Sequence, residues 1–177
     1  MSGIIGDNTG RGTGLIKAAA GAFFGQAVQT VKTDTASSTT SSFTDTGFNV
    51  AITPTATSSK IMVIVSVHYG QNYSTIFRLT RDIGGAGYNA ICIGDAASSR
   101  QRTTGGSDGS ATGGDTGDLS SWSTVFIDTP STTSAVTYRA EWFVESGGTG
   151  YLNRSREDAD NTHCPRSPSQ ITVLEIL

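Results

Sequence analysis

This sequence predicts an all-β fold: an antiparallel two-sheet sandwich, jelly-roll-like, behind an N-terminal glycine-rich arm. Strand-forming residues with a period of two dominate from Gln26 onward, and strong helix formers are scarce after the early part of the chain. Ser and Thr supply roughly a quarter of the 177 residues, while charged residues make up only 15%, below the about 25% of an average domain. About eight strands separated by turn residues are expected, which is the number that two packed sheets need.

The N-terminal segment, residues 1–25, is expected to form an arm separate from the sandwich of residues 26–177. Glycines there are interspersed with apolar pairs, and the candidate attachment residues are Ile4, Ile5, Leu15, Ile16, Phe23 and Phe24. Such a chain suits attachment to a neighbouring subunit, and fully extended it would reach roughly 80 Å. Residue propensities are equally compatible with a short helix over residues 15–28 that closes one end of the sandwich.

The first half of the sandwich is expected to contribute four strands. Residues 48–52 alternate between apolar and polar or small side chains. Residues 61–69 are apolar on both faces at first, which is typical of a central strand covered on both sides. The runs 76–81 and 88–93 flank a glycine-rich turn and are expected to pair as a hairpin.

The second half is expected to contribute four more strands. Residues 122–126 alternate, and residues 136–144 place aromatic and aliphatic side chains on one face and Arg139 and Glu141 on the other, as in a sheet with one wet face. Residues 151–154 form a short strand. The apolar end, residues 171–177, is expected to be buried in a sheet.

The longest segment without strand character, residues 96–119, is predicted to be a surface loop. It is rich in glycine and almost lacks apolar side chains, and loops of this length commonly carry function or are disordered. Its charged residues Arg100, Arg102, Asp108 and Asp115 are therefore the candidate contacts to a ligand. This loop is the candidate binding surface.

Charge and length argue against two classes of partner. The net charge is −3 and no basic cluster occurs, so neither nucleic acid nor an acidic membrane surface is an expected partner. The most apolar early run, residues 18–24, is too short to span a bilayer, and no targeting segment is expected. Cys92 and Cys164 are expected to be reduced and structural.

Residues with catalytic or metal-binding chemistry are few and poorly spaced. His163 and Cys164 are adjacent, so on an extended chain they point to opposite sides, and no second ligand pair completes a zinc site. The acidic cluster in residues 157–160 lacks the register of a calcium loop. We therefore expect no enzyme activity, no metal and no cofactor.

Four stretches of the sandwich carry a likeness to a known group of proteins. They are residues 28–35, residues 58–67, residues 151–155 with Asp158 and Asp160, and residues 169–176. Together they resemble a β-sandwich module of tail-fibre-like and capsid-decorating proteins of bacteriophages. This resemblance implies a virion protein, usually a homotrimer, with no catalytic residues to carry over.

The short N-terminal segment favours one function among those that the resemblance implies. A fibre places a long rod before its terminal module, whereas here only about 25 residues come first. A trimeric capsid decoration or cement protein, whose arm grips the major capsid protein, is the expected function. The alternative is a receptor-binding tail fibre or spike tip that recognises host surface glycans through residues 96–119, and a weaker alternative is a depolymerase. All of these place the protein in the virion, on the capsid surface or the tail.

Overall fold

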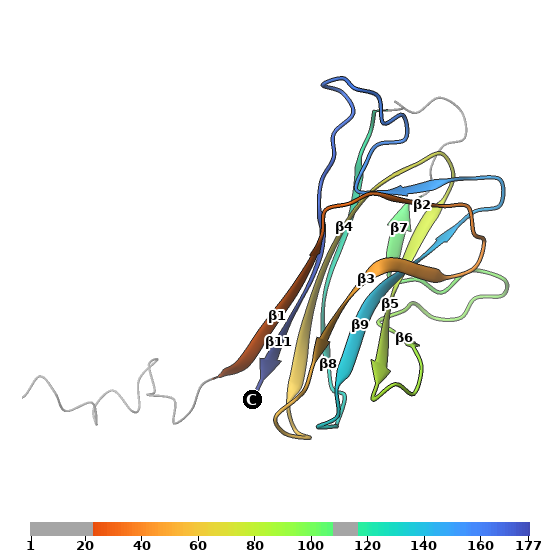
Figure 1. The fold of residues 1–177 in the computed structure, drawn as a ribbon. Helices are drawn as coiled ribbons and strands as arrows, with labels where there is room; N and C mark the ends of the chain where they lie inside the picture. Colours follow the sequence, from red (N-terminus) through yellow and green to blue (C-terminus); the bar gives the residue numbers. More distant parts are fainter. Residues whose placement is uncertain (1–22, 108–116) are drawn as a thin grey trace, which may run out of the picture.

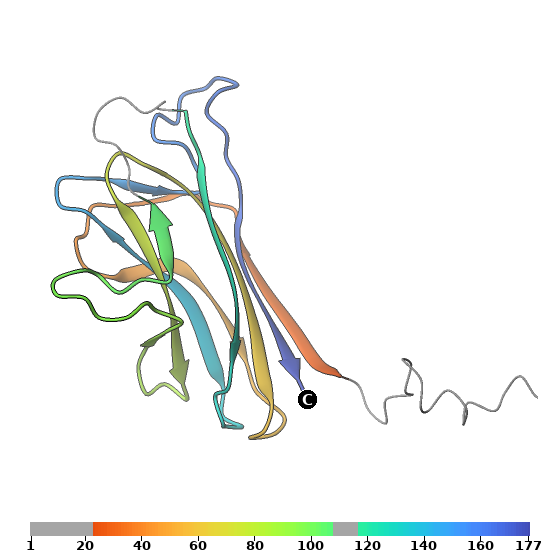
Figure 2. The same ribbon diagram turned by 180° about the vertical axis from the view of Figure 1, so that it is seen from behind.

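The computed structural model describes residues 23–107 and 117–177, which fold into two antiparallel sheets packed face to face (Figure 1), as the view from behind also shows (Figure 2). The predicted all-β sandwich is confirmed, and no helix occurs in the described residues. The strands are β1 (Phe24–Lys32), β2 (Ala36–Ser38), β3 (Thr44–Ile52), β4 (Lys60–Gln71), β5 (Thr75–Ile83), β6 (Asn89–Ile91), β7 (Gly105–Ser107), β8 (Ser120–Asp128), β9 (Val136–Val144), β10 (Gly150–Leu152) and β11 (Ser169–Ile176).

The first sheet, here sheet A, is built around β4. Along one side β4 pairs with β8 over nine residues, from Ile61 opposite Asp128 to Tyr69 opposite Ser120. Along the other side it pairs first with β11 and then with β10, and β1 and β2 extend the sheet beyond these two strands. At 12 residues β4 is the longest strand, and its apolar run predicted this central place.

The second sheet, here sheet B, has the order β3, β9, β5 and β6, and β7 pairs with the other end of β5. The predicted hairpin is confirmed, since Leu79 faces Ile91 and Arg81 faces Asn89. Strand β7 lies inside the predicted loop 96–119, where glycines gave no strand signal. It is only three residues long, and its formation depends on the neighbouring β5.

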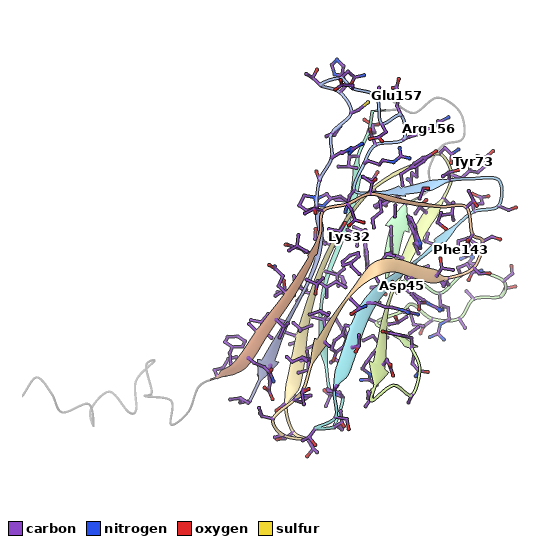
Figure 3. All side chains as sticks on the ribbon, viewed as in Figure 1. Lys32, Asp45, Tyr73, Phe143, Arg156 and Glu157 are labelled. Carbon is purple, nitrogen blue, oxygen red and sulfur yellow. The ribbon has the colours of Figure 1, made fainter. Side chains whose placement is uncertain are left out.

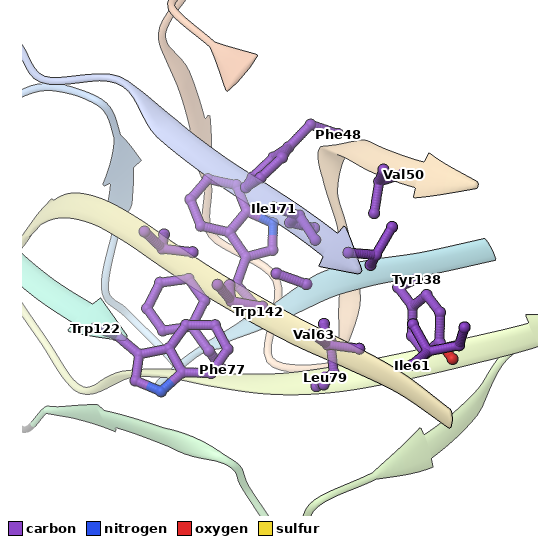
Figure 4. Packing of buried hydrophobic residues seen from close by; sticks show 14 of the residues in the cluster. Phe48, Val50, Ile61, Val63, Phe77, Leu79, Trp122, Tyr138, Trp142 and Ile171 are labelled. Atoms are coloured by element: carbon purple, nitrogen blue, oxygen red, sulfur yellow. The ribbon is translucent and has the colours of Figure 1, made fainter. Parts of the chain in front are cut away.

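The core lies between the sheets and is filled by alternate residues of the long strands (Figure 4). The rings of Phe77 and Trp122 stack with centroids 5.2 Å apart. A side chain on Gly105 would collide with the Trp122 indole, so this glycine allows β7 to lie directly over the ring. The largest fully buried apolar side chains are Tyr69, Tyr138, Phe77, Ile61, Leu79, Leu152, Ile171, Val50, Val63, Val65 and Val67.

The alternative of a helix over residues 15–28 is wrong for the residues that the structure describes. Phe24 to Val28 belong to β1, where Ala27 faces Leu174 and Val28 faces Val173. Pairing with a distant strand overrides the local propensity of this segment. The rest of the predicted helix lies outside the described residues.

A polar cluster joins the two sheets at one end of the core. Arg81 of β5 donates from Nη1 to both carboxylate oxygens of Asp128 in β8, at 2.7 and 2.9 Å, and the Tyr138 hydroxyl donates to the same carboxylate at 2.6 Å. Burial, followed by the bond to the Asp128 carboxylate, raises the pKa of Tyr138. The phenol therefore remains a proton donor, and the three side chains bridge sheet A and sheet B.

A second buried polar side chain, Asn153, ties three segments of sheet A together. Its amide nitrogen donates to the carbonyl oxygens of Lys32 and Asp34, both at 2.8 Å. Its amide oxygen accepts from the Ser169 hydroxyl at 2.6 Å. Asn153 is fully buried and has a φ of 60°, a conformation that Asn tolerates better than most residues.

Candidate assembly surface

The outer face of sheet A, which points away from sheet B, carries several aliphatic side chains and is uncovered. In β4 the inward side chains Val63 and Val65 are fully buried, whereas the outward Met62 and Ile64 are only half-buried. Among the described residues no element lies over this face. The expectation that β4 is covered on both sides is therefore wrong for the single chain, because the sandwich supplies only one covering sheet.

Strand registers align the outward side chains in rows across β1, β11, β4 and β8. One row consists of Ala27, Leu174, Met62 and Ile127, and the next consists of Gln29, Thr172, Ile64 and Val125. At the β8 edge Val125 is 63% and Ile127 is 50% exposed. Contiguous apolar surface of this kind commonly marks an interaction site.

The start of β1 adds aromatic side chains to one end of this face. The rings of Phe23 and Phe24 meet edge to face, 4.9 Å apart, and are 64% and 46% exposed. An open groove of about 390 Å³ lies beside them, lined by Phe23, Ser58, Lys60, Ile127, Ile176 and Leu177. Of the predicted attachment residues the structure thus describes Phe23 and Phe24; Ile4, Ile5, Leu15 and Ile16 lie outside the described residues.

Glu175 fixes the strands at this end. Its carboxylate accepts hydrogen bonds from the Thr55 backbone NH at 2.6 Å, the Thr55 hydroxyl at 2.7 Å and the Gln26 amide at 3.0 Å. Burial favours a higher pKa for Glu175, but the hydrogen bonds, led by that from the Thr55 backbone, outweigh burial and lower the pKa to about 2. The ionised carboxylate holds β1 and the segment before β4 against β11.

Acid is expected to weaken the sandwich through Glu175. Because its folded pKa is depressed, the ionised carboxylate contributes stability above its ordinary pKa of 4.5, and this contribution is lost as the pH falls toward about 2. The substitution Glu175→Gln is expected to lower the free energy of unfolding at pH 7 by about 1.5–3 kcal/mol. Urea denaturation at pH 7 and near pH 2 measures both values.

The exposed Glu145 provides the matched control. Glu145→Gln is expected to leave the free energy of unfolding at pH 7 within about 0.5 kcal/mol of wild type. The difference between wild type and Glu175→Gln should shrink toward pH 2. A difference that stays constant over this range would contradict the assigned role of the carboxylate.

The predicted binding loop is tied down at both ends of its described first part. The Gly94 NH donates to the Thr103 carbonyl at 3.2 Å, and the Thr104 NH donates to the Phe77 carbonyl at 2.9 Å. Arg102 donates from Nε to the Gly94 carbonyl at 2.7 Å. Arg100 and Arg102 are both exposed, and the remaining two candidates, Asp108 and Asp115, lie outside the described residues.

The outer face of sheet B is polar, and its charges neutralise each other. Glu141 of β9 accepts from Arg78 at 2.7 Å and also from Arg139, which reaches Asp45 of β3 at 3.3 Å. Asp45 and Phe143 lie on neighbouring strands of this sheet (Figure 3). Glu141, predicted to lie on the wet face, is only 3% exposed because the two arginines cover it.

Ring contacts extend this cover on sheet B. The Arg78 guanidinium lies 4.2 Å from the centroid of Phe43, and that of Arg139 lies 3.5 Å from the centroid of Tyr88. Both guanidinium groups are thus occupied by a carboxylate and an aromatic ring. The outer face of sheet A, rather than that of sheet B, carries the exposed aliphatic side chains Val125 and Ile127.

The residues with potential catalytic chemistry are not brought together in the described part of the chain. His163 is exposed in the connection before β11, while His68 lies in β4 with its Nδ1 2.8 Å from the Pro168 carbonyl. Within residues 23–107 and 117–177, no group of three His, Cys, Asp or Glu side chains could hold a metal ion.

The same ranges contain two free cysteines and no membrane-spanning helix. Cys92 and Cys164 are both half-buried and unbridged. No helix in the described ranges is long and apolar enough to cross a bilayer.

Comparison with known proteins adds little to these observations. No protein-family model matches the sequence, and no curated protein matches it. Among solved structures, the chain is similar to one described as the structure of infectious bursal disease virus, Gx strain, with 10% sequence identity and a TM-score of 0.41. The match covers 86% of this chain and 36% of the viral chain, so this chain spans about a third of that protein, and the likeness is too distant to assign a function.

Proposed function

We propose that the protein is a structural component of a bacteriophage particle: a homotrimeric capsid decoration or cement protein attached to the major capsid protein through its N-terminal arm. The apolar outer face of sheet A, beside the point where the arm joins β1, carries this proposal. A face that exposes 63% of Val125 and 50% of Ile127 needs a partner to exclude water from it.

The chemistry of the chain supports assembly over catalysis. Apolar and hydroxyl side chains dominate the outer face of sheet A. Burial of this face against a partner therefore removes few charges from water. The outward aromatic rings of Phe23 and Phe24 are of the type that is enriched at protein interfaces. The arm is continuous with this aromatic pair, which supports a capsid contact next to the contact between copies.

Removal of the arm is expected to abolish attachment to the particle. Deleting residues 1–22 leaves β1 intact, because this strand begins at Phe24. Particles grown with the truncated protein should carry at least about tenfold less of it, a loss of about 1.4 kcal/mol or more in binding free energy. Quantitative blotting of purified particles measures the occupancy, and the melting temperature of the purified protein checks that the sandwich is unchanged.

A matched variant separates the contribution of the arm from that of the two aromatic residues at the start of β1. Phe23→Ser with Phe24→Ser removes both exposed rings but retains the chain length, so an intermediate occupancy is expected. Full occupancy of the truncated protein would overturn attachment through the arm.

A receptor-binding tip is the second candidate function, favoured by the exposure of Arg100 and Arg102 on a loop whose ends are tied down. Immunogold labelling with an antibody to residues 96–107 decides between the two. Label over the head supports decoration, whereas label confined to the tail supports adhesion. In the second case Arg100→Ala with Arg102→Ala should reduce binding on a glycan array.

A further inference from the structure

Sheet A ends in three edge strands, the long β1 and β8 and the three-residue β2. Strands β1 and β8 contain nine residues each. Among the described residues, β1 forms a ladder only with β11, and β8 forms one only with β4. Each therefore has one side on which its backbone groups lack a strand partner, and such an edge is a ready template for pairing with another chain.

Apart from the register shift between Phe24 and Ala27 at the start of β1, neither edge carries a feature that usually prevents such pairing. Edge strands are commonly protected by central charges, by proline or by shortness. The only charged residue of β1 is Lys32 at its end, and the only one of β8 is Asp128 at its end, which is held by Arg81 in the core. Both strands are otherwise neutral, so pairing them brings no like charges together.

The strand directions make the two edges complementary. Across sheet A, β1, β11, β4 and β8 are antiparallel in each successive pair, so β1 and β8 run in opposite directions. When a second copy is rotated about an axis parallel to the strands, its β1 keeps its direction. That β1 then lies antiparallel beside β8, as β4 does on the other side.

We propose that β8 of each copy pairs with β1 of the next copy, closing a ring in which the outer faces of sheet A point toward the central axis. This deepens the proposed function and rests on the homotrimer in it, because three copies then join three pairs of edges. Sheet B lies on the opposite side of sheet A and so forms the outside of the ring (Figure 1). A neighbour's Ala27 would extend the apolar row that ends at Ile127.

The size of the face supports pairing at the edges in addition to packing of the faces. Four strands about 4.8 Å apart and nine residues of about 3.3 Å each give a face of roughly 600 Å². Two such faces together bury roughly 1,200 Å², the lower limit for a stable specific interface. Ladder hydrogen bonds at each edge add the directional contacts that a small apolar face lacks.

Hydrogen exchange measured by mass spectrometry on the purified full-length protein tests the ring. In the oligomer, peptides covering both β1 and β8 are expected to show at least about tenfold slower exchange than in the dissociated chain at high dilution. Protection of β8 alone would overturn the ring in favour of a two-fold β8–β8 pair. Protection of neither edge would overturn pairing at the edges altogether.

Lysine substitutions test the same edge through assembly. Val125→Lys with Ile127→Lys places two charges beside the β8 edge and should convert the oligomer into monomers in light scattering at micromolar concentration. Ala51→Lys with Asn49→Lys, on exposed positions of β3 in sheet B, is the matched control and should leave the oligomer intact. Dissociation in the control but not in the β8 variant would overturn the assignment of the interface.

Disulfide trapping identifies the neighbouring strand. In a background of Cys92→Ser and Cys164→Ser, chains carrying Ala27→Cys are mixed with chains carrying Ile127→Cys and oxidised. A crosslink that forms only when both cysteine variants are present supports the ring. A crosslink between two chains that both carry Ile127→Cys supports the two-fold pair and overturns the ring. These readouts use no virus particle, so the ring can fail while particle occupancy still supports the proposed function, and the reverse also holds.

Discussion

Asp128→Ala is expected to lower the free energy of unfolding by about 3–5 kcal/mol, the cost of breaking a buried ion pair by removing one partner. The Asp128 carboxylate accepts from Arg81 at 2.7 Å and from the Tyr138 hydroxyl at 2.6 Å. Without it, the half-buried charge of Arg81 and the buried phenol of Tyr138 lose this acceptor. Denaturation in urea at pH 7 measures the change.

Two further variants isolate the charge and the hydroxyl. Asp128→Asn keeps an oxygen that can accept from Tyr138 but loses the negative charge, so about half of the loss is expected. Tyr138→Phe removes only the hydroxyl and should cost about 1–2 kcal/mol. If Asp128→Ala costs less than 1 kcal/mol, the cluster does not join the sheets in the way described.

Asn153→Ala is expected to cost about 3–4 kcal/mol. The substitution removes the amide that donates to the carbonyl oxygens of Lys32 and Asp34 and accepts from Ser169. Each buried group left without a partner costs about 1–3 kcal/mol, and alanine adds strain at a φ of 60°. Urea denaturation again gives the free energy, and hydrogen exchange locates the loosened segments in β1 and β11.

Asn153→Gly separates backbone strain from lost hydrogen bonds. Glycine adopts this conformation without strain, so this variant should recover roughly 1 kcal/mol relative to alanine. Equal stability of the two variants would show that the hydrogen bonds alone account for the loss.

The long strands could be predicted because their packing follows a local pattern. In β9, every second residue is apolar and buried in the core: Val136, Tyr138, Ala140, Trp142 and Val144. The apolar run of β4 likewise predicted the centre of a sheet. Sheet membership and strand order depend on pairings between distant residues, which this periodicity does not contain.

The short strands and the buried polar residues could not be predicted for the same reason. Strand β7 consists of two glycines and a serine, and it forms because β5 offers a ladder and Trp122 a flat surface. Glu175 is an acidic residue within the apolar end of the chain, but its partner Thr55 is 120 residues away. Asn153 lies in the stretch 151–155, one of those that carry the resemblance. Nothing in the neighbouring sequence indicates its hydrogen bonds to the carbonyl oxygens of Lys32 and Asp34.

The candidate surface was signalled but misassigned. The apolar residues on both faces of β4 were interpreted as a strand covered twice within one chain, whereas the described chain covers only the inner face. Val125 is likewise an apolar side chain on the exposed face of its strand. A strand with two apolar faces can therefore indicate a partner outside the chain as well as one inside it.

The tied ends of the loop after β6 have a consequence for how such a protein evolves. The backbone hydrogen bonds from Gly94 to Thr103 and from Thr104 to Phe77 close a short loop and hold its two ends in place. Insertions or substitutions between these ends leave the β5 ladder and the Trp122 contact unchanged. Sequence and length between these ends are therefore expected to vary more among related chains than the strands around them, because such changes leave the scaffold intact.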